Sequence, residues 1–534
     1  MTFDQILLLG SIVVPALVSL ALFSGFAKSD AFVKKLAYLG FGFPLFSSVI
    51  LFFRFDLNGG AYAFEILNPR MGLQELKITF HLGLNGVSSP LFAVAGIVGF
   101  ASGMAAINSG AERMRLYLAL LTLMHSGLMG LFASVDLFFY YLFHEFALIP
   151  TFIMIGIWGG RDRRSVALEI TIYLTLGALL SLGGLVALNT MVDADSFDFP
   201  SLSKALAETA LLESTQSKIF GMLLLGFGIL VALFPFHTWA ARGYEAAPTS
   251  VSMLHAGVLK KFGIYGLIQI AAPLLPDAAL SWSPYLMWLA LGNVLFVGFV
   301  AIAQSNLKGM IGNGSVMHMG YCFLGVAVCT SLGASSAVML MAAHGLSVAL
   351  MFLLANYIHR RTDTLEMNEM GGMAARTPIL ACFFVAASLA TIGLPGFGNF
   401  WGEFGVFLSL GERPEHHIFL GLAALGIIIS AIFGLRAVAR IFFGESSEEL
   451  LEQIKKNPIL DLNSKEVIPA AVILIPLLAI GLWPRTISTR VDDEIQGRFD
   501  LVDKAAIIHF TPPCCPVNEN NTSQPSFSVP APQY

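Results

Sequence analysis

Charged side chains are scarce in this chain. Only 12% of its 534 residues are Asp, Glu, Lys or Arg, whereas 56% are hydrophobic, and the mean hydropathy is +0.75. So few charges cannot cover a soluble protein of this length with a hydrated surface. The composition therefore predicts an integral membrane protein.

Signals for two other classes of protein are missing. The formal net charge of −5 provides no basic surface, so no nucleic-acid partner is expected. The five cysteines are scattered, and no C-x-x-C spacing predicts zinc or an iron–sulfur cluster, so we expect no redox centre in this chain.

The first apolar stretch, from Ile6 to Phe26, lacks a basic leader and a cleavage site, which favours a retained helix over a signal peptide.

Long apolar runs follow one another along the chain. A spanning helix needs roughly 20 mostly apolar residues. By this measure the sequence predicts an all-α, polytopic membrane protein with about fourteen spans, at 6–26, 33–53, 87–107, 115–133, 136–158, 166–189, 219–240, 250–272, 284–304, 309–330, 335–358, 378–410, 416–441 and 466–484.

Two of these spans contain helix breakers. The twelfth includes GLPGFGNFWG at 393–402, and the seventh includes LFPFHTW at 233–239, so each is expected to be two half-helices. The twelfth span is the fifth after the seventh, and this odd offset makes the two cross in opposite directions, which is typical of inverted repeats around an ion path. The expected parts are 1–114 (spans 1–3), 115–272 (first repeat, spans 4–8), 273–441 (second repeat, spans 9–13), 442–484 (loop and span 14) and 485–534 (a polar, disordered tail).

Basic residues are distributed unevenly between the loops that connect the predicted spans. Loops after odd-numbered spans hold most Lys and Arg residues, and among the short loops after even-numbered spans only Arg413 departs from this pattern. The positive-inside rule therefore predicts that both termini face the non-cytoplasmic side. We expect the membrane to be a bacterial plasma membrane.

Of the ionisable residues inside predicted spans, six are candidates for a function: Glu145, Lys260, Lys261, His318, His344 and Glu403. On insertion scales a charge at the centre of a spanning helix costs roughly 2.5 to 3.5 kcal/mol. Carboxylate, amine and imidazole groups can each gain and lose a proton. Burial raises the pKa of a carboxyl group and lowers the pKa of an amine, so both pKa values move closer to neutral pH. Such groups along a water-lined path could relay protons without a metal or cofactor.

Structural roles are the alternative for each residue. Glu145, Lys260, Lys261 and Glu403 could bond between helices or to unwound backbone, and the two histidines could be neutral core groups. Adjacent helical positions point about 100° apart, so the two lysines cannot share one path. Three further histidines, His125, His144 and His237, are expected to be structural.

Several strings resemble one family, the antiporter-like membrane subunits of NADH:quinone oxidoreductase (complex I) and the related cation/proton antiporters. They thread the chain from about residue 80 to 440: FHLGLNGVSSPLF at 80–92, LFHEFALIPTFIMIGIWGG at 142–160, LFPFHTW at 233–239, APTSVSMLHAGVLKKFGIYGL at 247–267, SVMHMG at 315–320, HGLSVA at 344–349 and GLPGFGNFWGEF at 393–404. Within the family, Glu403 in the broken twelfth span and the short C-terminus resemble the M-type subunit.

The resemblance implies a role for each candidate. Glu145 would gate the path by pairing with a lysine, and Lys261 would be the central relay group. His318 and His344 would bridge to Glu403, the last donor before the exit side. Flavin, iron–sulfur clusters and quinone would be held by partner subunits, and the membrane partners would be L-type, N-type and small subunits.

Three positions depart from the family pattern. Leu230 stands where the seventh span usually has a lysine that pairs with the glutamate of the fifth, while Tyr244 replaces a histidine and Asn85 an aspartate. We therefore consider two hypotheses: Lys260 substitutes as the partner of Glu145, or Glu145 stays protonated and that half of the path is inactive. The alternative functions are a cation/proton antiporter without a redox partner and a subunit that keeps the fold with impaired pumping.

Overall fold

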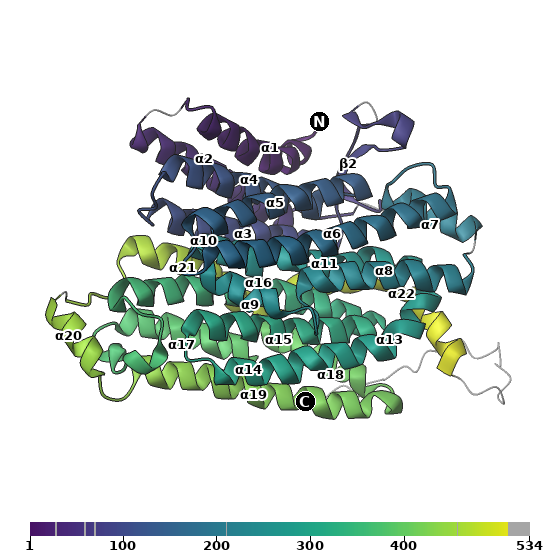
Figure 1. Ribbon diagram of the computed structural model, residues 1–534. Coiled ribbons are helices and arrows are strands. Elements are labelled where there is room, and N and C mark those ends of the chain that lie inside the picture. The colour runs from purple at the N-terminus through teal and green to yellow at the C-terminus, as the bar shows by residue number, and fades with distance from the viewer. Residues whose placement is uncertain (27–28, 58–59, 69–70, 210, 457, 511–534) are drawn as a thin grey trace, which may run out of the picture.

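The computed structural model describes residues 1–26, 29–57, 60–68, 71–209, 211–456 and 458–510. Long helices run side by side and form an elongated stack (Figure 1). Within the described residues, eleven helices are long and apolar enough to cross a membrane. The other three predicted spans, at 250–272, 309–330 and 378–410, are also helical but are interrupted or more polar, so every predicted span coincides with helical segments.

The first eight spans and their connections fill the N-terminal half. Their elements are α1 (Phe3–Phe23), α2 (Asp30–Phe53), β1 (Ala63–Asn68), the 3₁₀ turn η2 (Gln74–Leu76), β2 (Phe80–Leu84), α3 (Ser88–Ile107), α4 (Met114–Ala133), α5 (Leu137–Trp158), α6 (Arg163–Val192), α7 (Phe199–Glu208), α8 (Glu213–Val231), α9 (Thr238–Ala246), α10 (Thr249–Gly257), the 3₁₀ turn η3 (Leu259–Lys261), α11 (Phe262–Gly266), the π-helical η4 (Leu267–Ala271) and α12 (Ala272–Leu274).

The remaining six spans form the C-terminal half. Their elements are α13 (Pro276–Leu291), the π-helical η5 (Gly292–Val297), α14 (Gly298–Ala303), α15 (Leu307–Ala327), α16 (Ser331–Thr362), the 3₁₀ turns η6 (Met367–Glu369) and η7 (Met373–Ala375), α17 (Pro378–Ile392), α18 (Gly398–Gly411), η8 (Pro414–His416), α19 (His417–Phe442), α20 (Glu448–Lys456), α21 (Ser464–Leu482) and α22 (Arg485–Phe510).

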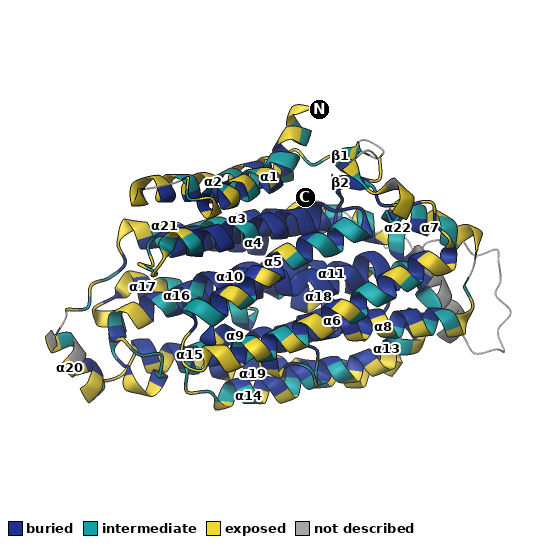
Figure 2. Cartoon of the chain, turned by 45° about the horizontal axis from the view of Figure 1, so that its top comes forward, coloured by how far each residue is buried: buried dark blue, intermediate teal, exposed yellow. Residues whose placement is uncertain are grey.

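Helix α16 is the centre of the stack. Its spanning window is wholly buried, and it contacts α3, α10, α15, α17, α18, α21 and α22. Outer helices such as α1, α6 and α19 have many exposed positions (Figure 2), and these carry large apolar side chains including Leu20, Ile172 and Ile428. An apolar outer surface of this extent suits contact with lipid or with other membrane subunits.

Both predicted broken spans are confirmed. The seventh is interrupted between α8 and α9, and the twelfth between α17 and α18. Asn293 supplies hydrogen-bond partners to backbone groups at the first break. Its Oδ1 accepts from the Phe234 N–H at 2.5 Å, and its Nδ2 donates to the Ala232 and Val316 carbonyls at 3.0 and 3.1 Å. Free backbone groups at membrane depth need such partners. The residue boundaries of the two repeats stay a prediction.

The eighth span departs from a regular helix. A 3₁₀ turn, η3, separates α10 from α11, and η4 then widens to a π-helix. Departures of this kind inside a helix often mark functional positions. Here the tightened turn contains both Lys260 and Lys261.

The loop between the second and third spans contains a β-hairpin that the sequence analysis did not expect. Strands β1 and β2 pair antiparallel, with Ile66 opposite Leu82 and Asn68 opposite Phe80. Strand β2 is buried along its length and also bridges to Ser134, just before α5. The hairpin therefore closes the end of the stack where α5 begins.

The prediction of a disordered tail from residue 485 is wrong for residues 485–510. These residues form α22, whose buried side chains recur at Ile487, Val491, Ile495, Phe499 and Val502. This spacing gives one apolar face, which packs on α12, α13 and α16. The average composition of residues 485–510 is polar, so composition alone did not predict this apolar face. Residues 511–534 of the predicted tail lie outside the described residues.

We expect Asn293→Ala to destabilise the chain. The change removes the Asn293 bonds to the Phe234 N–H and the Ala232 carbonyl at the break, and each buried group left without a partner costs about 1–3 kcal/mol. Thermal melting of the detergent-solubilised chain, followed by size-exclusion chromatography, should show a clearly lower midpoint. Asn108→Ala is the control, because Asn108 bonds only the Met104 carbonyl of its own helix. Equal midpoints for the two variants would contradict this account.

Candidate functional site

Four of the predicted residues form a buried line. The Lys261 Nζ lies 3.3 Å from His344 Nδ1, the rings of His344 and His318 are 5.7 Å apart between centres, and His318 Nδ1 lies 3.1 Å from Glu403 Oε1. They come from four elements, η3, α16, α15 and α18. Each residue is at most 4% exposed. The line crosses the centre of the stack, from the middle of the eighth span to the broken twelfth span.

Lys261 is positioned by the irregular eighth span. Its Nζ donates to the Ala256 carbonyl oxygen at 2.5 Å. The carbonyls in the last turn of a helix have no partner within the helix, and α10 ends at Gly257. A single ammonium group therefore caps α10 and reaches His344.

The link between the two histidines is the longest in the line. The rings are inclined by 60°, and His318 Nε2 has no hydrogen-bond partner among the described residues. This nitrogen is free to bond a bridging water or to meet His344 after a ring rotation.

Glu403 lies against the unwound part of the twelfth span. Gly393 has a φ of +82° and packs so closely that a Cβ there would overlap the Glu403 carboxylate. Glycine meets two requirements at this position, since it adopts a left-handed backbone at little cost and has no side chain. The carboxylate is thereby held beside irregular backbone at the end of the line.

Lys260 contacts a different set of groups. Its Nζ donates to Ser315 Oγ at 3.2 Å and lies 5.6 Å from the centre of the Tyr244 ring. No ion pair or hydrogen bond between described residues joins it to Glu145. The hypothesis that Lys260 pairs directly with Glu145 is therefore wrong in this structure, because the amine points toward α15 rather than α5.

Glu145 lies apart from the line. Its ionisable neighbours on α5 are His144, whose Nδ1 is 3.4 Å from Glu145 Oε1, and Tyr141, whose hydroxyl bonds the carboxylate. The Glu145 side chain is 25% exposed, whereas that of His144 is 1% exposed. The structure brings Lys261, His344, His318 and Glu403 together and leaves Glu145 at the edge of the stack.

The sequence analysis missed several polar residues beside this line. His144 was expected to be structural, and His255 and Ser315 were not considered. His255 lies five positions before Lys260 on the same span, and Ser315 lies three positions before His318. Helical spacing to His318 was a signal that could have found Ser315, whereas His144 and His255 have no such spacing to Glu145 or Lys260.

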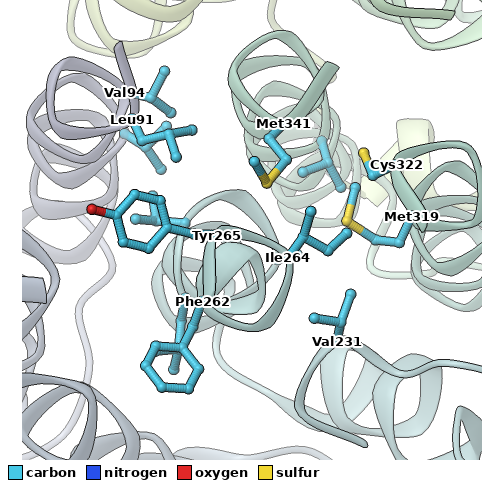
Figure 3. Packing of buried hydrophobic residues seen from close by; sticks show 14 of the residues in the cluster. Leu91, Val94, Val231, Phe262, Ile264, Tyr265, Met319, Cys322 and Met341 are labelled. Carbon is cyan, nitrogen blue, oxygen red and sulfur yellow. The ribbon is translucent and has the colours of Figure 1, made fainter. Parts of the chain in front are cut away.

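Apolar side chains surround the line. Figure 3 shows Ile264, Met319, Cys322 and Met341 close together beside α11, and all four are buried. Phe262, Ile264 and Tyr265 project from α11 in different directions into neighbouring helices (Figure 3). Such walls exclude bulk water and strengthen electrostatic interactions between the enclosed polar groups.

Two interrupted spans and a buried line of ionisable groups are typical of an ion-translocating membrane protein. The family model described as "NADH:quinone oxidoreductase/Mrp antiporter, TM" matches residues 134–436. The chain belongs to this family. The resemblance drawn from the motifs is confirmed.

Relatives and solved structures agree with this membership. The chain is 32% identical to NAD(P)H-quinone oxidoreductase chain 4 1 of Picosynechococcus sp., over 85% of this chain and 84% of that protein. It is 30% identical to NADH-quinone oxidoreductase subunit M of Rickettsia felis, over 86% and 91%. A chain of respiratory complex I from Thermus thermophilus matches with a TM-score of 0.82 and 26% identity, over 93% and 99%. A chain of the Mrp complex from Dietzia sp. shares the fold, with a TM-score of 0.81 and 18% identity, over 95% and 100%.

We expect Gly393→Ala to displace Glu403. Alanine at a left-handed position costs about 1–2 kcal/mol, and here its methyl group also overlaps the carboxylate. Gly396→Ala is the matched control, because Gly396 has a φ of +103° but no described atom within 4 Å of the added methyl group. Proton transport by Gly393→Ala should fall well below that of Gly396→Ala. Equal losses would show that backbone strain alone is responsible.

Proposed function

We propose that this chain moves protons across the membrane as the M-type subunit of an NADH:quinone oxidoreductase. The observation that carries the proposal is the buried line Lys261–His344–His318–Glu403, with contacts of 3.3 and 3.1 Å at its two ends. Burying four ionisable groups in apolar surroundings is expensive, so their presence at one place indicates a function. The subunit M and chain 4 relatives support the choice of complex.

Each step in the line is a proton transfer between neighbouring groups. A protonated Lys261 donates to His344, whose imidazole passes a proton to His318 through a bridging water or a ring rotation. His318 then donates from Nδ1 to the Glu403 carboxylate. Glu403 releases the proton beside the unwound segment at Gly393. Because neighbouring cations repel, loading one group lowers the proton affinity of the next, so the charge states of the line change together.

Energy for transport would come from partner subunits. We propose that flavin, iron–sulfur clusters and quinone are bound there, that electrons pass from NADH to quinone in those subunits, and that this chain holds no redox centre. The T. thermophilus match is a chain of respiratory complex I, which supports membership in a multi-subunit assembly. L-type, N-type and small membrane subunits are the proposed neighbours. We also propose a bacterial plasma membrane for the complex, and the bias of basic residues supports an orientation with both termini outside the cytoplasm.

A cation/proton antiporter without a redox partner is the second candidate. The likeness to the Mrp complex chain favours it, although at 18% identity that likeness concerns the fold alone. A subunit with impaired pumping is the third, because buried Leu230 occupies the position where the family pattern has a lysine. The intact line from Lys261 to Glu403 supports pumping over the third candidate.

We expect His344→Gln to impair proton pumping. Glutamine is polar but does not relay a proton at neutral pH, and a positioned acid–base group typically contributes 10²–10⁴-fold to a transfer step. Inverted membrane vesicles that contain the assembled complex would be energised with NADH, and the initial rate of acidification should fall at least tenfold. His125→Gln is the control, since His125 is also fully buried in a spanning helix but stacks on Phe41 outside the line. Equal rates for the two variants would refute the relay.

The neighbours of the chain separate the first two candidates. Purified through an affinity tag in mild detergent, the chain should carry subunits that show flavin fluorescence and the electron paramagnetic resonance of reduced iron–sulfur clusters. The antiporter would be favoured if the chain is recovered only with other membrane subunits and if this preparation shows full cation/proton exchange activity in proteoliposomes.

A further inference from the structure

A second group of buried polar residues lies beside the line and has no role in it so far. Its members are His144 on α5, Tyr244 on α9, His255 on α10, Lys260 in η3 and Ser315 on α15. All five are at most 4% exposed. Burying so many polar groups in one place requires either mutual bonding or a function.

His144 is held against the span that carries the lysines. Its ring stacks on Phe262 at 4.0 Å between centres, and Phe262 directly follows Lys261. Tyr140, one turn earlier on α5, stacks on the same phenyl ring and donates to the Phe262 carbonyl at 2.8 Å. His144 Nδ1 faces Glu145 at 3.4 Å, yet neither it nor Glu145 Oε1 has a hydrogen-bond partner among the described residues. A buried imidazole nitrogen thus lies unpaired beside the carboxylate.

His255 connects α5 with the two lysines. It lies in the last turn of α10, which contacts α5 and leads into the 3₁₀ turn that carries Lys260 and Lys261. Its Nδ1 lies 3.3 Å from the Tyr244 hydroxyl, and the Trp239 ring packs against its edge. The ring is therefore fixed among groups that can exchange protons.

Lys260 continues from this histidine to the line. Its amine lies near the Tyr244 ring and donates to Ser315 Oγ at 3.2 Å. Ser315 is one helical turn before His318 on α15. The group therefore extends from Glu145 at the edge of the stack to the start of the Lys261–Glu403 line.

A cavity of about 400 Å³ opens close to this group. Its lining includes Glu245, Ser250, Lys308 and His359, and it lies at the end of the stack that carries the basic loops. Ser250 bonds the Tyr117 hydroxyl and precedes His255 by five residues on α10, about 7.5 Å along the helix axis. An opening of this size can hold several waters, between one and two helical turns from His255.

The seventh span offers no alternative partner for Glu145. Between Lys218 and His237 the sequence has no ionisable residue, and Leu230 packs against Gly177 of α6. Besides His144, the Tyr141 hydroxyl, one helical turn earlier on α5, also bonds the Glu145 carboxylate.

We propose that His144 and His255 carry protons between Glu145 and Lys260, as a branch that feeds the Lys261–Glu403 line. This inference rests on the proposed proton translocation. In each step an N–H or O–H bond breaks as an N–H or O–H bond forms on the next group, so no co-reactant is needed. His255 exchanges protons with His144 on one side and with the lysines on the other, while Tyr244 is a positioning residue that orients the imidazole.

The test compares His144→Gln, His255→Gln and the double variant in the assembled complex. Vesicles energised with NADH would be assayed for the initial rate of acidification and for protons moved per NADH oxidised. Each single change, and Glu145→Gln, should lower the acidification rate roughly tenfold. The double variant should be no slower than the slower single variant, because both residues lie in one series. His125→Gln is again the control.

Several outcomes would overturn the branch. Losses that multiply in the double variant would place the two histidines in independent roles, and rates equal to that of His125→Gln would show that they carry no protons. If the His255→Gln variant does not assemble, Tyr244→Phe provides the test, because it removes only the hydroxyl bonded to His255. A lower acidification rate with normal assembly would support the branch, and an unchanged rate would contradict it. Loss of pumping in His344→Gln together with normal pumping in His255→Gln would reject the branch alone, whereas normal pumping in both would reject the proposed function as well.

Discussion

The structure depends on one constraint, that a polar group buried at membrane depth must find its partner within the protein. Hydrocarbon offers no hydrogen bonds, so an unpaired amine or carboxyl group there is strongly disfavoured. Four groups on four separate elements meet this requirement together, since Lys261 contacts His344 and His318 contacts Glu403. The fold surrounds them with helices, and α16, which carries His344, is the most completely enclosed.

The same constraint explains the irregular helices. Where the seventh span breaks, Asn293 pairs with backbone groups on both sides, and the Trp239 indole donates to the Ile229 carbonyl at 3.1 Å. In the eighth span the 3₁₀ turn directs Lys261 to a free carbonyl of α10 and to His344. Interruptions that weaken an isolated helix thereby create sites where polar groups meet, which is how transporters commonly build ion paths at the midplane.

Much of the fold could be predicted because lipid makes simple demands on sequence. Apolar length located the spans, and proline with glycine located both breaks. The hairpin at β1 and β2 and the helix α22 escaped prediction because neither crosses the membrane: their burial depends on neighbours distant in sequence, as when Arg490 of α22 donates to the Phe52 carbonyl of α2 at 2.5 Å. Average polarity is a poor guide for such segments, since a single apolar face is enough for docking.

For the functional site, the sequence by itself determined which residues are too costly to bury without a purpose. The scarcity of charge made Glu145, Lys261 and Glu403 conspicuous, and family motifs supported their selection. Only the tertiary structure decided which of them meet: Lys260 turns to Ser315 rather than to Glu145, and His144 lies unpaired beside the carboxylate. The reason is geometric, because residues adjacent on one helix point in different directions and their partners come from other helices, whose rotation and depth are set by packing across the whole stack.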